Sequence, residues 1–172
     1  KYNQMNQKNS FNKEELLSMA NGDMFGQENA KLPLEPMLMI DRVLSIKSDG
    51  GTYNKGSIKA EMDITEESWF FHCHFKGDPV MPGCLGLDGM WQLVGFFLTW
   101  SGAKGKGRAL GVGDVKFRGQ VRPYHEKIVY NVSVKKLITR SKSMIWADAE
   151  MQADDKKIYT AKNLQVGIFD NL

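Results

Sequence analysis

Two side chains capable of acid–base chemistry flank the predicted start of an apolar helix near the middle of the chain. His74 lies in a proline- and glycine-rich loop, and Asp88 lies early in the apolar stretch that follows. Gly83 and Cys84, directly after Pro82, would present free backbone N–H groups at the positive end of the helix dipole. Such groups can stabilise a developing oxyanion. The pattern therefore indicates acid–base chemistry on a polarised carbonyl.

Spacing along the predicted helix adds a supporting residue. Asp88 lies about 7.5 Å along the helix axis from Gly83, and Gln92 follows Asp88 at the i+4 spacing that lets its amide hold the carboxyl group. Three glycines interrupt the helix at about 1 kcal/mol each relative to alanine: Gly86, Gly89 and Gly95. We infer that something packs very close to this helix, either a strand or an acyl chain.

Each of these residues alone also has a simpler structural explanation. A histidine in a turn is usually a hydrogen-bonded loop residue, and an aspartate near a helix N-terminus can simply offset the dipole. The adjacent residues of His72-Cys73-His74 point in different directions, and no further Cys/His cluster supplies ligands, so no metal site is predicted. The glycines of 105–111 lack the GxGxxG spacing of a dinucleotide site.

Length and composition indicate one globular domain over residues 1–172, with residues 1–4 interpreted as a cloning remnant ahead of Met5. The two cysteines, Cys73 and Cys84, lie close to the loop and do not form a disulfide scaffold. With no signal segment at the start, we expect a reducing, cytoplasmic compartment. The apolar run 85–100 carries Asp88 and Gln92 and is too short to span a membrane, so a buried helix is expected.

The net charge of +3 conceals a strongly basic stretch. Residues 104–142 hold eleven Lys and Arg against Asp114 and Glu126, a local charge of about +9. Most of these side chains fit solvated strand faces and turns, and a docking surface for an acidic partner is the sharper interpretation. Nucleic acid is not expected, because no recognition motif and no interleaved aromatic side chains accompany the charge.

Hydrophobic periodicity predicts the elements around the site. Asn12 and Glu15 have capping-box spacing for a helix over 12–20, and Pro82 suits the first position of a helix over 82–100. Strands are expected at 37–46, 56–64, 128–135, 145–151 and 158–169, and a loop at 101–108. One long apolar helix and alternating strands favour an α+β fold in which the sheet wraps the helix.

A family resemblance covers nearly the whole chain. The run HFKGDPVMPGCLGLDGMWQLVGFF at 74–97 is similar to the hallmark of the 3-hydroxydecanoyl-acyl carrier protein dehydratase/isomerase family of bacterial fatty acid synthesis. The similarity extends to MLMIDRV at 37–43, GKGRALGVGDVKFRGQV at 105–121 and IYTAKNLQVG at 158–167. It implies a hot-dog fold, a curved antiparallel sheet around a long central helix, and a homodimer. Each interface site would take His74 from one subunit and Asp88 from the other.

The resemblance also implies the chemistry of the site, and this chemistry needs no metal or other cofactor. The substrate would be a 3-hydroxyacyl thioester of about ten carbons on acyl carrier protein. His74, its ring fixed by the Val80 carbonyl, would remove a C2 proton while the Gly83 N–H stabilises the enolate oxygen. Asp88, oriented by Gln92, would protonate the departing C3 hydroxyl. Isomerisation of trans-2-decenoyl to cis-3-decenoyl product would follow at the same site, with an acyl tunnel walled in part by Phe71 and Phe75.

Several alternatives stay open at this point. Aspartate at position 88 favours the bifunctional branch, because the dehydratase-only branch typically carries glutamate there. The chain departs from the common pattern at Gly89, expected to enlarge a pocket, and at His72, a second titratable group; spacing to Pro82-Gly83 favours His74 as the base. The competing functions are a dehydratase without isomerase activity, a non-catalytic hot-dog module that binds acyl carrier protein, and a thioesterase on the same fold.

The basic stretch acquires a partner from the resemblance, since acyl carrier proteins are acidic. The first candidates for docking are Lys135, Lys136, Arg140 and Lys142, and the second choices are Lys104, Lys106 and Arg108.

Overall fold

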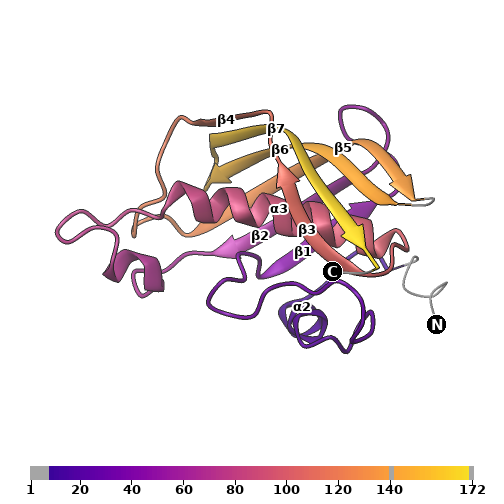
Figure 1. Cartoon of the computed structure of the whole chain (residues 1–172). Helices are drawn as coiled ribbons and strands as arrows, with labels where there is room; N and C mark the ends of the chain where they lie inside the picture. The colour runs from indigo at the N-terminus through magenta and orange to yellow at the C-terminus, as the bar shows by residue number, and fades with distance from the viewer. Residues whose placement is uncertain (1–7, 140–141, 171–172) are drawn as a thin grey trace.

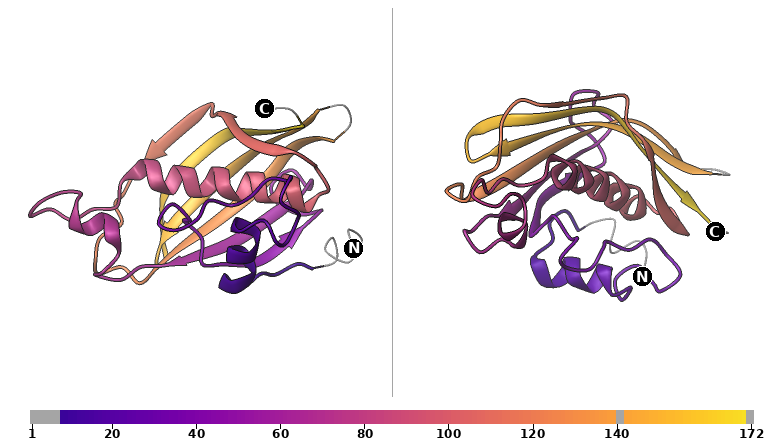
Figure 2. Two further views of the ribbon diagram at one scale, coloured as in Figure 1. Left: turned by 60° about the horizontal axis from the view of Figure 1, so that its bottom comes forward. Right: turned by 60° about the vertical axis from the view of Figure 1, so that its left-hand side comes forward.

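A curved antiparallel sheet wraps one long helix in the structure, a computed structural model that describes residues 8–139 and 142–170 (Figures 1 and 2). In these residues the elements are α2 (Lys13–Ala20), β1 (Arg42–Lys47), β2 (Ser57–Asp63), the 3-10 helix η1 (Trp69–His72), α3 (Gly83–Trp100), β3 (Lys106–Gly111), β4 (Asp114–Phe117), β5 (Lys127–Thr139), β6 (Ser143–Ala153) and β7 (Lys156–Phe169). The sheet lies on one side of α3 and α2 lies on the other. The predicted α+β hot-dog architecture is confirmed.

The sheet has the strand order β1-β2-β5-β6-β7-β3, and β4 also pairs with β7. The long strands β5, β6 and β7 form two consecutive antiparallel pairs, as their alternating sequences predict. Along β5 the buried side chains are Ile128, Tyr130, Val132 and Val134. These side chains face the helix, and each fully buried aliphatic contributes about 1.5–3 kcal/mol to folding.

The glycines of α3 separate its sheet side from a more open side. A Cβ on Gly86 would lie 2.8 Å from the Tyr159 ring, and one on Gly89 would lie 2.4 Å from the Tyr130 hydroxyl. Strand side chains therefore fill the space at both positions, and the expectation that Gly89 enlarges a pocket is wrong. Gly95 differs, since a Cβ there would meet only Val166, at 3.7 Å.

The segment 37–41 is not part of a strand, contrary to the prediction of a strand over 37–46, and β1 begins only at Arg42. The backbone of Met39 bonds to side chains instead of to a neighbouring strand: its N–H donates to Gln92 Oε1 at 2.9 Å, and its carbonyl accepts from the Tyr130 hydroxyl at 3.0 Å. These two contacts satisfy the backbone groups that a ladder would have used.

The expected loop at 101–108 is also wrong in part, because residues 106–108 belong to β3, which pairs with β7. The short strand β4 was not predicted either. Both strands lie in a glycine-rich stretch with no clear apolar alternation, so pairing with β7 decides their conformation. At α3, Pro82 occupies the N-cap and the helix begins at Gly83, one residue later than predicted.

The N-terminal helix begins as predicted. Asn12 caps α2, its side chain accepts from the Glu15 N–H at 2.9 Å, and the Glu15 side chain accepts from the Asn12 N–H at 3.1 Å. Lys13 then bonds to Asp41 at 2.9 Å and joins α2 to the start of β1. Among the residues described, no helix is long and apolar enough to cross a membrane.

Candidate active site

His74 lies in a tight hairpin-like loop between η1 and α3, which projects from the body of the molecule (Figure 1). Its backbone carbonyl accepts from the Val80 N–H at 2.8 Å, and its ring Nδ1 lies 2.8 Å from the Val80 carbonyl oxygen. Because a carbonyl can only accept, Nδ1 carries the proton and donates. In the neutral imidazole this bond leaves Nε2 as the unprotonated nitrogen, which is the form that a general base requires.

The N-terminus of α3 adjoins this histidine. The N-cap residue Pro82 makes no side-chain capping bond, so the N–H groups of the first turn have no side-chain acceptor there. His74 and Gly83 line one cleft of about 530 Å³ together with Phe117 and Tyr159. A Cβ on Gly83 would lie 3.1 Å from the Phe117 ring, so glycine permits this close approach. A carbonyl oxygen in this cleft could meet the helix N-terminus beside the histidine.

The cleft beside His74 has an aromatic wall in which the phenol group of Tyr159 has a raised pKa. The rings of Phe117 and Tyr159 meet edge to face, with centroids 4.6 Å apart. Burial raises the pKa of Tyr159 to about 12, with a smaller contribution from the Cys84 thiol. Tyr159 is therefore a neutral phenol near pH 7.

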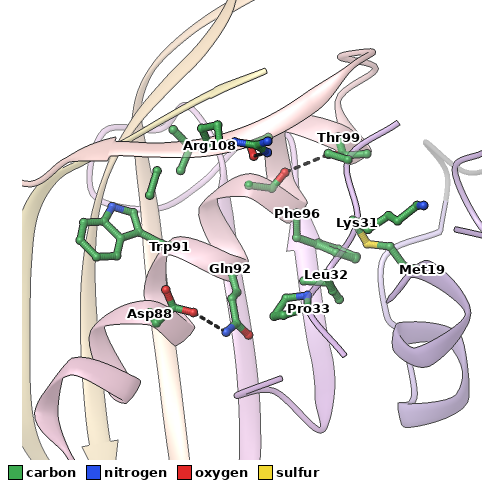
Figure 3. A pocket seen from close by; sticks show the side chains of 15 residues that line it. Met19, Lys31, Leu32, Pro33, Asp88, Trp91, Gln92, Phe96, Thr99 and Arg108 are labelled. Atoms are coloured by element: carbon green, nitrogen blue, oxygen red, sulfur yellow. Dashed lines mark hydrogen bonds between the residues drawn. The ribbon is translucent and has the colours of Figure 1, made fainter. Parts of the chain in front are cut away.

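Asp88 lies in the second turn of α3, where Gln92 holds it. Gln92 Nε2 donates to Asp88 Oδ2 at 2.7 Å (Figure 3). It also donates to the Met37 carbonyl at 2.8 Å, while Gln92 Oε1 accepts from the Met39 N–H. The amide of Gln92 is buried and uses both its donor and its acceptor. It therefore fixes Asp88 Oδ2 and leaves Oδ1 available for another partner.

A second cleft, of about 310 Å³, receives the Asp88 side chain. It lies between α3, the segment 30–33 and β3, and much of its lining is apolar, including Leu32, Pro33, Phe96 and Val166 (Figure 3). Gly95 lies on this open side of α3, where the absence of a side chain leaves room. The cleft thus combines a carboxyl group with an apolar cavity, an arrangement that suits a substrate with a polar head and a hydrocarbon chain.

The structure does not bring His74 and Asp88 together within one chain. His74, Val80 and Gly83 line the first cleft, and Asp88 and Gln92 line the second. Cys84 is an exposed free thiol at the start of α3. The two acid–base groups therefore occupy separate cavities, one at the first residue of α3 and one along its residues 88–99.

The two phenylalanines expected to line the tunnel have different positions. Phe71 is buried, and its ring packs against Phe70 with centroids 4.8 Å apart, so it belongs to the core and lines neither cleft. Phe75 is 55% exposed, and its ring lies 3.7 Å from that of His74. The second histidine, His72, is exposed, and its Nε2 lies 3.5 Å from a carboxyl oxygen of Glu67.

Of the first-choice docking residues, Lys135 and Lys136 lie on β5 and Lys142 directly precedes β6. Lys135 donates to Asn163 at 2.9 Å, and Lys136 lies over the Trp146 ring at 5.0 Å. Lys142 is exposed, and Arg140 lies outside the described residues. Of the second choices, Arg108 lines the Asp88 cleft. No group of three or more potential metal ligands occurs in the described ranges.

The cleft residues that were not identified from sequence as site residues include Phe117, Tyr159 and Trp91. Trp91 donates from its indole nitrogen to the Gly111 carbonyl at 3.1 Å, which ties α3 to β3. Tyr159 and Phe117 lie in two runs that carry the family resemblance, and that was the available signal. Neither residue type indicates a catalytic site by itself.

Comparison with known proteins identifies the family. The family model described as "FabA-like domain" matches residues 32–162. The chain therefore belongs to the FabA-like domain family, a class of hot-dog proteins.

Solved structures with low sequence identity share the fold. The dehydratase heterocomplex ApeI:P from Xenorhabdus doucetiae is similar with a TM-score of 0.61 at 14% identity, over 80% of this chain and 87% of that one. An uncharacterized protein from Pyrococcus horikoshii has a TM-score of 0.52 at 10% identity, over 80% and 88%. The fluoroacetyl-CoA thioesterase FlK has a TM-score of 0.52 at 9% identity, over 66% and 85%. These likenesses concern the architecture alone.

Proposed function

We propose that the protein dehydrates 3-hydroxyacyl thioesters carried by acyl carrier protein and isomerises the trans-2 product to the cis-3 form. The observation that carries the proposal is the His74 ring, held through Nδ1 by the Val80 carbonyl with Nε2 free, in one cleft with Gly83 at the start of α3. Membership of the FabA-like family supports the same chemistry.

The first step is removal of a C2 proton. A thioester carbonyl placed at the α3 N-terminus would accept from the Gly83 N–H, and the helix dipole would stabilise the enolate oxygen that develops there. His74 Nε2 takes the C2 proton, and the Val80 carbonyl stabilises the imidazolium that forms through its bond from Nδ1. The backbone thus supports both the developing anion and the developing cation.

The second step is loss of the C3 hydroxyl group. Asp88 in its protonated form gives a proton to this oxygen, which leaves as water as the C2–C3 double bond forms. Gln92 determines which carboxyl oxygen is free to act, because its amide occupies Oδ2. Isomerisation then transfers one proton from C4 and adds one at C2, and His74 can serve both transfers.

A second copy of the chain completes the site in this proposal. The separation of His74 and Asp88 into two clefts is consistent with each histidine working against the aspartate of a partner subunit. Phe75 is exposed on the projecting loop and Trp69 on η1, and β3 lies at the edge of the sheet with Leu110 exposed. Apolar side chains at an exposed edge and on a projecting loop suit burial in a dimer interface.

The carrier protein would dock on the basic surface near β5 and β6. Lys136 and Lys142 are exposed there, and acidic carrier proteins complement their charge. A double variant, Lys136→Ala with Lys142→Ala, should raise the KM for the carrier-linked substrate at low salt and leave kcat unchanged. An unchanged KM would remove these residues from the docking surface.

Product analysis of 3-hydroxydecanoyl-acyl carrier protein tests the function itself. Incubation with the purified protein should yield both trans-2 and cis-3 decenoyl products by gas chromatography and mass spectrometry. Trans-2 product alone would withdraw the isomerase activity. Free acid would indicate a thioesterase, and unchanged substrate would indicate a binding module.

A further inference from the structure

The loop that carries His74 has few connections to the rest of the protein. Its internal bonds join Phe75 with Asp78 in both directions, at 2.8 and 3.0 Å, and Val80 with His74. Residues 75–78 are exposed, and a Cβ on Gly77 at the tip would meet nothing within 4 Å. Packing therefore does not hold the tip at 75–78, whereas Met81 at the end of the loop is buried in the core. Bonds from other segments to residues 78–81 are left to hold the part of the loop next to the tip.

Two neighbouring residues supply these external bonds. Within the described part of the chain, the polar contacts from other segments to residues 75–81 come from Val121 and Arg122. The Val121 carbonyl accepts from the Met81 N–H at 3.0 Å. Arg122 Nη1 donates to Asp78 Oδ1 at 2.6 Å and to the Pro79 carbonyl at 3.1 Å. One guanidinium nitrogen thus holds both the side chain and the backbone of the loop.

A rigid turn holds Arg122 in place. The His125 N–H donates to the Arg122 carbonyl at 3.0 Å, and the Arg122 N–H donates to His125 Nδ1 at 2.8 Å. Pro123 follows Arg122 at the turn position that favours proline. The arginine side chain therefore projects from a turn that is closed by two hydrogen bonds.

We propose that Arg122 is a positioning residue for the reaction: its guanidinium fixes the loop at Asp78 and Pro79, so that the adjacent Val80 carbonyl holds the His74 ring with Nε2 toward the substrate. The inference rests on the proposed function and extends it to a residue that touches neither substrate nor reacting atoms. The order of contacts is direct, since Pro79 precedes Val80 and Val80 bonds to His74.

The exposure of this ion pair separates a positioning role from a structural one. The Arg122 side chain is 30% exposed and that of Asp78 is 62% exposed. Ion pairs that exposed contribute little to folding, because solvent screens them. Loss of the pair should therefore misplace the histidine without destabilising the fold, and misplacement by a fraction of an ångström is costly for catalysis.

Two substitutions and a matched control test this role. Arg122→Met keeps much of the side-chain length and removes the donors, and it should lower kcat about tenfold with an unchanged KM. Arg122→Lys keeps a charged donor and should restore most of the rate. Lys157→Met breaks an exposed ion pair with Glu150 that joins β7 to β6 and does not involve the loop, and it should leave kcat unchanged. All variants should melt within about 3 °C of the wild type.

A readout independent of turnover is the tautomer of His74. The chain has three histidines, so long-range ¹⁵N spectra of the imidazoles can be assigned by substitution. The structure gives His74 as the Nδ1–H form and His125 as the Nε2–H form, because Nδ1 of His125 accepts a bond. In Arg122→Met, the His74 signals should shift toward a mixture of tautomers.

The outcomes distinguish this inference from the proposed function. Wild-type kcat in Arg122→Met would overturn the positioning role, as would a raised KM at constant kcat, which would make Arg122 a docking residue. If Arg122→Met lost activity and also melted well below the wild type, Arg122 would have a structural role. If the wild type forms no enoyl product, the proposed function fails, while the His74 tautomer still reports whether Arg122 controls the loop.

Discussion

The two halves of the candidate site are held in different ways. Asp88 lies on a buried helix, and the amide of Gln92 links its carboxyl to the backbone of Met37 and Met39. His74 lies on an exposed loop, and backbone bonds with one exposed ion pair determine its position. Substitutions around Asp88 should therefore change stability and activity together, whereas substitutions around His74 should change activity alone.

Removal of the base should produce the largest effect on rate and a small one on stability. His74→Ala is expected to reduce turnover by at least about 10²–10⁴-fold, the usual contribution of a general base. Its melting temperature should stay near that of the wild type, because the loop is exposed. Steady-state assays and calorimetry measure both quantities. His72→Ala is the control, and turnover lost there but kept in His74→Ala would transfer the role to His72.

Removal of the Gln92 amide beside Asp88 should lower both the stability of the fold and the rate of turnover. Gln92→Leu leaves the buried Met39 N–H unpaired and removes the donor to the part-buried Met37 carbonyl, which should cost about 1–3 kcal/mol of unfolding free energy and also lower kcat. Urea denaturation and turnover assays test the pair of effects. Gln92→Glu keeps an acceptor for the Met39 N–H and loses the amide donor. Its unfolding free energy should therefore lie between those of the wild type and Gln92→Leu. Wild-type stability in Gln92→Leu would mean that the bonds from Gln92 to the 37–39 backbone do not hold this part of the site in place.

The two sides of α3 should respond oppositely to an added methyl group. Gly86→Ala places a Cβ against the buried Tyr159 ring and Met151 and should destabilise the protein by about 1–3 kcal/mol. Gly95→Ala faces the open cleft and should stabilise the helix by about 0.5–1 kcal/mol. Chemical denaturation measures both. Equal effects of the same sign would show that the open side of α3 is not open.

The smallest expected effect concerns an exposed pair at the start of β1. The hydrogen bond from Arg42 lowers the pKa of Asp63. A lowered folded-state pKa contributes stability above the unfolded value, about 3.9, and loses it as pH falls through the folded value. Asp63→Asn should therefore cost less than about 0.5 kcal/mol at pH 7, because solvent screens the pair, and less at pH 2 than at pH 7. Denaturation at the two pH values tests this sign.

Much of the scaffold could be predicted because its signals are local. The alternation in 128–135, the capping box at Asn12 and Glu15, and the apolar run of α3 each depend on neighbouring residues. The strands β3 and β4 escaped prediction, because only pairing with β7 makes their glycine-rich sequences extended. The segment around Met39 was wrong for a related reason, since its backbone partners are the distant side chains of Gln92 and Tyr130.

In the candidate site, too, the residues with a local sequence signal could be predicted and those placed by distant contacts could not. His74, Gly83 and Asp88 lie in one continuous motif, so the resemblance located all three together. Arg122 is 44 positions from Asp78 in the chain, and an arginine in a basic stretch has no distinguishing pattern. The contact becomes visible only when the turn at 122–125 is folded beside the loop. The acid–base groups of this site therefore have a clearer pattern in the sequence than the residue that holds the loop in place.

The bond between Gln92 and the Met39 N–H has a consequence for the dynamics of the chain. Met39 is outside any strand or helix, and the amides of such segments usually exchange quickly with deuterated solvent. Here a buried side chain of α3 accepts from that amide, and exchange requires the helix and the segment 37–41 to separate. This irregular segment should therefore exchange as slowly as the core strands, and it would open only when the Asp88 cleft is lost.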